Sequence, residues 1–90
     1  MKKQVHVYYS GRVQGIGFRF AAVRLAEELG VFGWVENLSD ARVELVAEAN
    51  ESVLKDFLAQ LDTIFNRYIQ NAQTSWEPAT GEFKDFGVKI

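Results

Sequence analysis

The stretch SGRVQGIGFRF, residues 10–20, stands where the pattern of the chain changes from that of a strand to that of a helix. Before it, residues 4–10 alternate between apolar and polar side chains, which is typical of a half-buried strand. After it, apolar residues recur with a helical period from Phe18 until Gly30, a residue that favours the end of a helix. We therefore expect residues 11–17 to form a loop that leads directly into a helix.

The rest of the chain predicts a hairpin, a second helix and two further strands. β-branched and aromatic residues favour the strands, and Asn50 is a suitable N-cap for the helix. The apolar stripe of that helix consists of Leu54, Phe57, Leu58, Leu61, Ile64 and Phe65. The expected ranges are strands at 31–38, 42–49, 68–77 and 83–90, with turns at 39–41 and 78–82.

This order of elements is the split pattern of ferredoxin-like α+β proteins, with one strand added at the end. We expect a single domain, residues 1–90, built as a βαββαβ sandwich with two helices on one face of an antiparallel sheet. Such a fold hosts many functions and identifies none of them by itself.

The composition excludes several classes of function. The chain has no cysteine and one histidine, so it offers no thiolate nucleophile, no cysteine zinc site and no histidine cluster for a transition metal. Its net charge of −2 lacks the basic excess of a general nucleic-acid binder. No apolar segment is long enough to cross a bilayer, and no signal peptide follows the N-terminal lysines. We expect a cytoplasmic protein with no membrane partner, in which His6 has a surface or strand-packing role.

The glycine loop has two interpretations on its residues alone. A loop that leads into the N-terminus of a helix presents unpaired N–H groups and the positive end of the helix dipole. Phosphate is the ligand that such a site typically binds. Gly15 and Gly17 would let the backbone approach a ligand, and Arg19 could hold two phosphate oxygens. The alternative is an ordinary strand-to-helix connection that needs glycine. The loop matches neither a Walker motif nor a dinucleotide-binding fingerprint.

An RNA-binding module of the same fold is a further candidate. Such modules carry an aromatic motif similar to GIGFRF, residues 15–20, but on the third strand. Here the motif opens a helix, and the strand RVELVAEA, residues 42–49, has no aromatic residue on which a base could stack. We expect no nucleic-acid partner.

Three segments together carry a family resemblance. GRVQGIGFR at 11–19 resembles the acylphosphatase signature, GWVENLSDARVELVAEA at 33–49 resembles the second signature of that family, and TSWEPATGEFKDFGVKI at 74–90 resembles its closing segment. The resemblance implies hydrolysis of acyl phosphates to a carboxylate and inorganic phosphate, without metal or cofactor. The catalytic arginine of the family matches Arg19, and its catalytic asparagine matches Asn37.

Elementary chemistry agrees with these roles. A carboxylate is a good leaving group, so the reaction needs mostly positioning and charge stabilisation. Arg19 would bind the phosphoryl oxygens, and Asn37 would orient the attacking water. The backbone amides that would also hold these oxygens belong to Gln14, Gly15, Ile16, Gly17 and Phe18. The expected partners are a small-molecule acyl phosphate and inorganic phosphate.

We expect a monomer of broad substrate specificity. No segment predicts a pocket for an acyl chain, and we expect Trp34, Trp76 and the seven phenylalanines to pack in the core and sheet. The alternatives are a non-catalytic phosphate-binding or regulatory module of the same fold, and an acylphosphatase-like part of a larger carbamoyl-transfer enzyme, which the length of the chain disfavours. The chain departs from the family at Ala41 and Ala49, which replace glycines. A positive φ at Ala41 would cost on the order of 1 kcal/mol.

Overall fold

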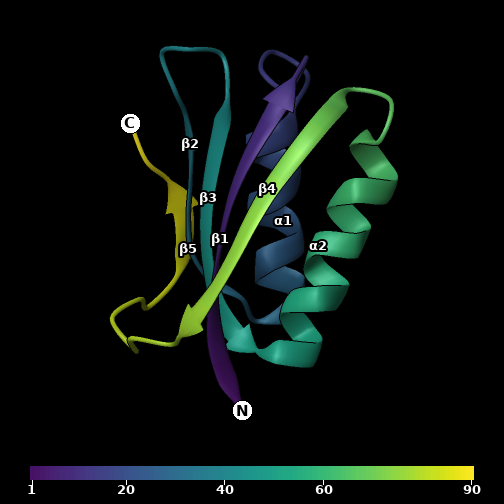
Figure 1. Cartoon of the computed structure of the whole chain (residues 1–90). Helices are drawn as coiled ribbons and strands as arrows, with labels where there is room; N and C mark the ends of the chain where they lie inside the picture. Colours follow the sequence, from purple (N-terminus) through teal and green to yellow (C-terminus); the bar gives the residue numbers. More distant parts are fainter.

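The first strand, β1, forms the middle of the molecule. A computed structural model describes residues 1–90 as one five-stranded sheet in the order β4-β1-β3-β2-β5. Both helices cover the same face of this sheet (Figure 1). The elements are β1 Lys2–Gly11, α1 Phe18–Leu29, β2 Phe32–Asn37, β3 Val43–Asn50, α2 Glu51–Phe65, β4 Ile69–Pro78 and β5 Phe86–Val88. The predicted order of elements and the ferredoxin-like α+β fold are therefore confirmed.

The predicted antiparallel pairing is confirmed for β1 to β4, but it does not extend to the last strand. β5 pairs with β2 in parallel, Gly33 opposite Phe86 and Val35 opposite Val88. The reason lies in the path of the chain, because β4 ends at the end of the sheet where β2 begins (Figure 1). A strand that starts there must run in the same direction as β2. Residues 83–85, which we expected to be part of the strand, belong to the connection instead.

The core lies between the sheet and the helices. Val5, Val7 and Tyr9 of β1 are buried on the helix-facing side, as their alternation predicts. The buried residues of the two helices are Phe18, Ala22, Leu25, Ala26, Leu54, Phe57, Leu61 and Phe65. The helical spacing of these residues places them on one stripe of each helix.

Two predicted packing roles and one predicted capping role in the second half of the chain were wrong. Ile64 is 51% exposed, because it lies on the flank of the α2 stripe rather than on its centre. Trp76 is 41% exposed, because it belongs to β4, an edge strand whose residues after Ile69 are all exposed. Asn50 stands at the N-cap position of α2, but its side chain makes no capping hydrogen bond.

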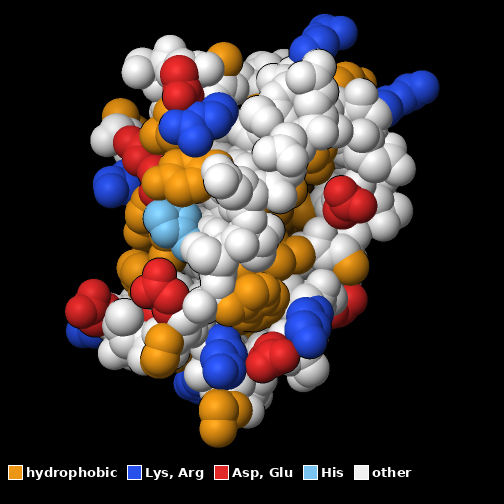
Figure 2. Space-filling model, viewed as in Figure 1, with side chains coloured by type: hydrophobic (Ala, Val, Ile, Leu, Met, Phe, Trp, Pro, Cys, Tyr) orange, Lys and Arg blue, Asp and Glu red, His pale blue; other side chains and the backbone are white.

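The other face of the sheet is not covered by helices. His6 lies there half-buried, with Nε2 2.6 Å from Oε2 of Glu44. The centroid of its ring lies 4.8 Å from the centroid of the Tyr8 ring. Figure 2 shows the histidine at the surface among apolar and charged side chains. The expected surface or strand-packing role of His6 agrees with this position. No helix of the chain has the length and apolar character that a membrane span requires.

Candidate functional site

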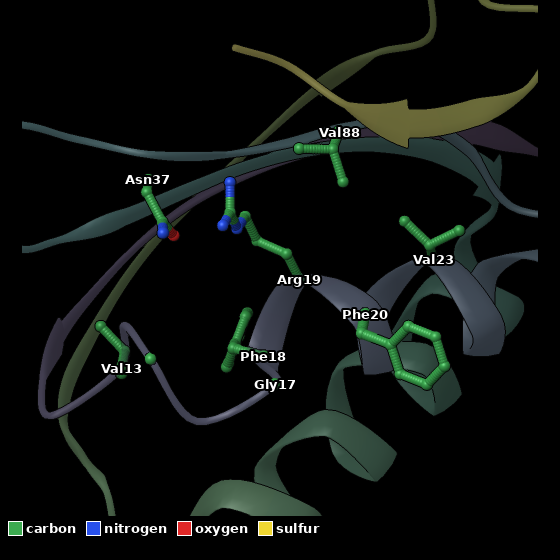
Figure 3. Close-up of a pocket in the computed structure, with 9 residues that line it drawn as sticks. Val13, Gly17, Phe18, Arg19, Phe20, Val23, Asn37 and Val88 are labelled. Atoms are coloured by element: carbon green, nitrogen blue, oxygen red, sulfur yellow. The ribbon is translucent and has the colours of Figure 1, made fainter.

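One pocket joins the beginning of α1 to the end of β2. It has a volume of about 460 Å³. The loop between β1 and α1 forms its floor, and β5 contributes one side chain from the far end of the chain (Figure 3). The residues that line it are Val13, Gly15, Gly17, Phe18, Arg19, Phe20, Val23, Asn37 and Val88. Segments that are distant in sequence therefore meet at one place.

The loop offers a series of unused backbone donors. None of the N–H groups from Val13 to Phe20 donates a hydrogen bond within the chain. Gly15 and Gly17 have φ values of 77° and 85°, and a Cβ built on either would meet no atom within 4 Å. The left-handed conformation explains why glycine is needed at both positions, and the open space leaves the donors accessible. Free N–H groups at the positive end of a helix dipole form an anion-binding site.

Two polar side chains point into the same pocket from different elements. Arg19 comes from the first turn of α1 and Asn37 from the last position of β2 (Figure 3). Arg19 forms no salt bridge, so no carboxylate of the chain neutralises its charge. Oδ1 of Asn37 is buried without a hydrogen-bond partner, the only such side-chain atom in the protein. A buried acceptor without a partner costs free energy unless a ligand or water satisfies it.

Gln14 connects the loop to the β2–β3 hairpin. Its Nε2 donates hydrogen bonds to the carbonyl oxygens of Leu38, at 2.8 Å, and of Arg42, at 3.0 Å. These bonds fix the distance between the loop donors and Asn37, which directly precedes Leu38. The sequence predicted only a backbone role for Gln14, since no local pattern indicates which distant carbonyl a glutamine will reach.

The structure brings most of the predicted site residues together. Gly15, Gly17, Phe18, Arg19 and Asn37 all line the pocket. The other two predicted residues belong to the same loop but do not line it: the side chain of Gln14 is turned to the hairpin, and that of Ile16 packs against the core.

Sequence reasoning missed an apolar side of the pocket. Phe20, which we expected to pack in the core or sheet, is 68% exposed and lines the pocket with Val23 and Val88. Phe18 occupies the inward position of the first turn of α1, so Phe20, two residues later, points outward. The helical period that begins at Phe18 predicts that Phe20 points outward. It does not predict which residues from other segments lie near the exposed ring.

The geometry defines an anion site of loop amides and one arginine, with an uncharged amide beside it, on a ferredoxin-like α+β domain. The acylphosphatase family model matches residues 5–88. The chain therefore belongs to the acylphosphatase family. No group of three or more histidine, cysteine, aspartate or glutamate side chains is arranged to hold a metal ion.

Individual relatives agree with this assignment. An acylphosphatase of Caldanaerobacter subterraneus subsp. tengcongensis is 37% identical over 89 residues, which cover 98% of this chain and 99% of that protein. The crystal structure of acylphosphatase from Bacillus subtilis has a TM-score of 0.89 at 26% identity and covers 98% of this chain and 99% of its own. The structure of T. kodakarensis HypF has a TM-score of 0.83 at 31% identity, covering 98% of this chain but 12% of that chain.

Proposed function

We propose that this protein hydrolyses acyl phosphates, with Arg19 and the loop amides holding the phosphoryl group and Asn37 orienting the attacking water. Membership of the acylphosphatase family supports the reaction. The observation that supports these residue roles is the meeting of unused N–H groups, an unpaired guanidinium and an unsatisfied amide oxygen in one pocket.

The reaction is a phosphoryl transfer to water. The water oxygen forms a bond to phosphorus while the bond from phosphorus to the bridging oxygen breaks, and that oxygen leaves with the acyl group as a carboxylate. The attacking water loses one proton, which passes to a phosphoryl oxygen or to solvent. Because the leaving group is already a weak base, the enzyme needs to supply positioning and charge stabilisation rather than an acid.

Arg19 and the loop amides stabilise the negative charge on the phosphoryl oxygens. The guanidinium can donate two parallel hydrogen bonds to the phosphoryl oxygens, and the loop amides add further donors that need no reorganisation during the reaction. Donors fixed before the substrate arrives stabilise the transition state most effectively, and the hydrogen bonds of Gln14 hold this loop against the hairpin.

Asn37 acts on the water. Its Oδ1 can accept a hydrogen bond from the water, and its NH₂ group can donate to a phosphoryl oxygen. A carboxylate at this position would place a second negative charge beside the anionic substrate. The unsatisfied state of Oδ1 supports the role, since a bound water would supply the missing donor.

The alternative of a non-catalytic phosphate-binding module is not favoured. A module that only bound phosphate would use the loop and Arg19, but it would not require an unsatisfied amide at position 37. The family relatives are named as enzymes. We further propose that the activity needs no metal or cofactor, and that the protein acts as a cytoplasmic monomer on a small-molecule acyl phosphate.

The test is hydrolysis of benzoyl phosphate in the presence of a chelator. We expect the parent to be active, and Arg19→Ala to lose about a hundredfold to a thousandfold in kcat/KM. Asn37→Ala should lose a similar factor in kcat, whereas the inhibition constant of inorganic phosphate should change by much less, because Arg19 and the loop amides still hold the anion. In heavy-oxygen water the label should enter phosphate and not benzoate.

Matched variants separate these roles from general damage. Arg67→Ala and Asn71→Ala remove the same side-chain types at exposed positions outside the pocket, and both should retain the activity of the parent. A parent without turnover that still binds phosphate would contradict the enzymatic proposal in favour of a binding module. Full activity of Asn37→Ala would contradict the role of that residue alone.

A further inference from the structure

The pocket is larger than its anion site and has an apolar side that the reaction at phosphorus does not use. A volume of about 460 Å³ lies within the range of roughly 300–1,000 Å³ for small-molecule sites. A phosphate has five heavy atoms, and a water molecule occupies about 30 Å³ in the liquid, so phosphate fills only part of this space. Apart from Val13, which lies on the side of Asn37, the remaining lining consists of Phe20, Val23 and Val88, which we call the apolar wall.

The apolar wall is built from two separate segments and is open to solvent. Phe20 and Val23 lie three residues apart on α1, so they share one face of the helix. Val88 belongs to β5 and is 44% exposed. The ring of Phe20 stacks on no other aromatic ring, and its cationic neighbour is Arg24, whose Cζ lies 5.7 Å from the ring centroid. Within the chain, therefore, the packing leaves this ring largely uncovered.

The wall lies on the side of Arg19 opposite Asn37. Figure 3 shows Asn37 and Val13 on one side of the guanidinium, and Phe20 and Val23 on the other. In phosphoryl transfer the attacking and leaving oxygens lie roughly in line on opposite sides of phosphorus. If water is oriented from the side of Asn37, the leaving carboxylate and the group attached to it point toward the wall.

We propose that Phe20, Val23 and Val88 form a subsite for the acyl group, and that the protein prefers acyl phosphates with an aromatic or branched aliphatic acyl group. This inference rests on the proposed function and adds a substrate class to it. An aryl group would pack against the Phe20 ring and remove apolar surface from water on both partners. An acetyl group is too short to cover the wall. This proposal differs from the expectation of broad specificity that the sequence supports.

The test is the ratio of kcat/KM for benzoyl phosphate to that for acetyl phosphate. The intrinsic reactivities of the two anhydrides cancel when this ratio is compared between variants. We expect Phe20→Ala and Val88→Ser to lower the ratio, Phe20→Ala by about tenfold, and Phe20→Leu to restore part of it. Phe32→Ala, which truncates an exposed phenylalanine outside the pocket, should leave the ratio as in the parent.

A second measurement tests the subsite without turnover. Phenacylphosphonate and acetonylphosphonate carry a CH₂ group in place of the bridging oxygen, so they cannot be hydrolysed at that position. Calorimetry should show that the parent binds the phenacyl compound more tightly and that Phe20→Ala loses this preference. Equal binding of the two compounds by the parent, or an unchanged ratio in Phe20→Ala and Val88→Ser, would overturn the subsite. A parent that binds both phosphonates but hydrolyses neither acyl phosphate would instead overturn the proposed function.

Discussion

At the scale of the residue, Ala41 has a backbone conformation that only glycine adopts easily. It is the one residue other than glycine with a positive φ, 78°, and it lies in the turn between β2 and β3. The turn requires this conformation, because the N–H of Ala41 donates to the carbonyl of Leu38 and the N–H of Leu38 donates to that of Arg42. Ala41 therefore has the positive φ for which the sequence analysis expects a cost.

We expect Ala41→Gly to stabilise the protein by about 0.5–1 kcal/mol, since the relief of left-handed strain exceeds the entropic cost of glycine. The midpoint of thermal unfolding should rise by about 2–8 °C for a domain of this size. The matched control is Ala49→Gly, the other position where glycine is replaced, which has no positive φ and lies buried in β3. That change should lower the midpoint, and a rise in both variants would show that strain at Ala41 is not the cause.

At the scale of the element, the loop and the hairpin work as one unit through Gln14. Its amide donates to two carbonyls of the hairpin turn. Both carbonyls also accept a backbone N–H, so neither would be left without a partner if the side chain were removed. The side chain therefore contributes only about 1 kcal/mol to stability. Its main effect is to fix the position of the loop relative to the hairpin.

Truncation of Gln14 should consequently affect the reaction more than the fold. We expect Gln14→Ala to lower kcat for benzoyl phosphate by about tenfold to a hundredfold, because small displacements of aligned groups are costly. The free energy of unfolding should fall by only about 1 kcal/mol in urea denaturation. Gln73→Ala, an exposed glutamine of β4, serves as the control. A large loss of stability without a loss in kcat would contradict the positioning role.

At the scale of the whole molecule, one buried carboxylate anchors the chain where it crosses from β4 to β5. Glu48 of β3 accepts hydrogen bonds from the side chain of Gln4, from the N–H and hydroxyl of Thr80, and from the N–H of Gly81. Burial alone raises the pKa of the Glu48 carboxyl, but these donors stabilise the charged form more strongly, and the net pKa lies below its ordinary value of 4.5. The anchored segment leads to β5 and thus to Val88 in the pocket.

This anchor predicts a pH dependence of stability. Because the pKa of Glu48 is lower in the folded state than in the unfolded chain, its contribution is complete above about pH 4.5 and is lost as the pH falls through the folded pKa. We expect Glu48→Gln to lower the free energy of unfolding by about 2–4 kcal/mol at neutral pH and to make it less dependent on pH in the acid range. Glu77→Gln, an exposed glutamate of β4, should change neither quantity. Parallel curves for the parent and Glu48→Gln would contradict the prediction.

Much of the fold could be predicted because its signals are local. The alternation in β1 and the helical stripes depend on neighbouring residues alone, so the order of elements follows from the pattern, as do the ranges of all but the last strand. Two of the errors arose where position in the assembled sheet decides the outcome. Trp76 is exposed because β4 lies at an edge, and β5 is parallel because of where β4 ends. The pattern of neither segment contains that information.

The sequence by itself determined the strand-to-helix loop with its two glycines, the positions of Arg19 and Asn37, and the family, since motifs and periods are properties of the chain. Only the tertiary structure decided what these residues face. It left Oδ1 of Asn37 without a partner, tied Gln14 to the hairpin and brought Val88 to the pocket that Phe20 also lines. The physical reason is that such contacts join segments distant in sequence, and their geometry exists only once the sheet order and the chain crossings are fixed.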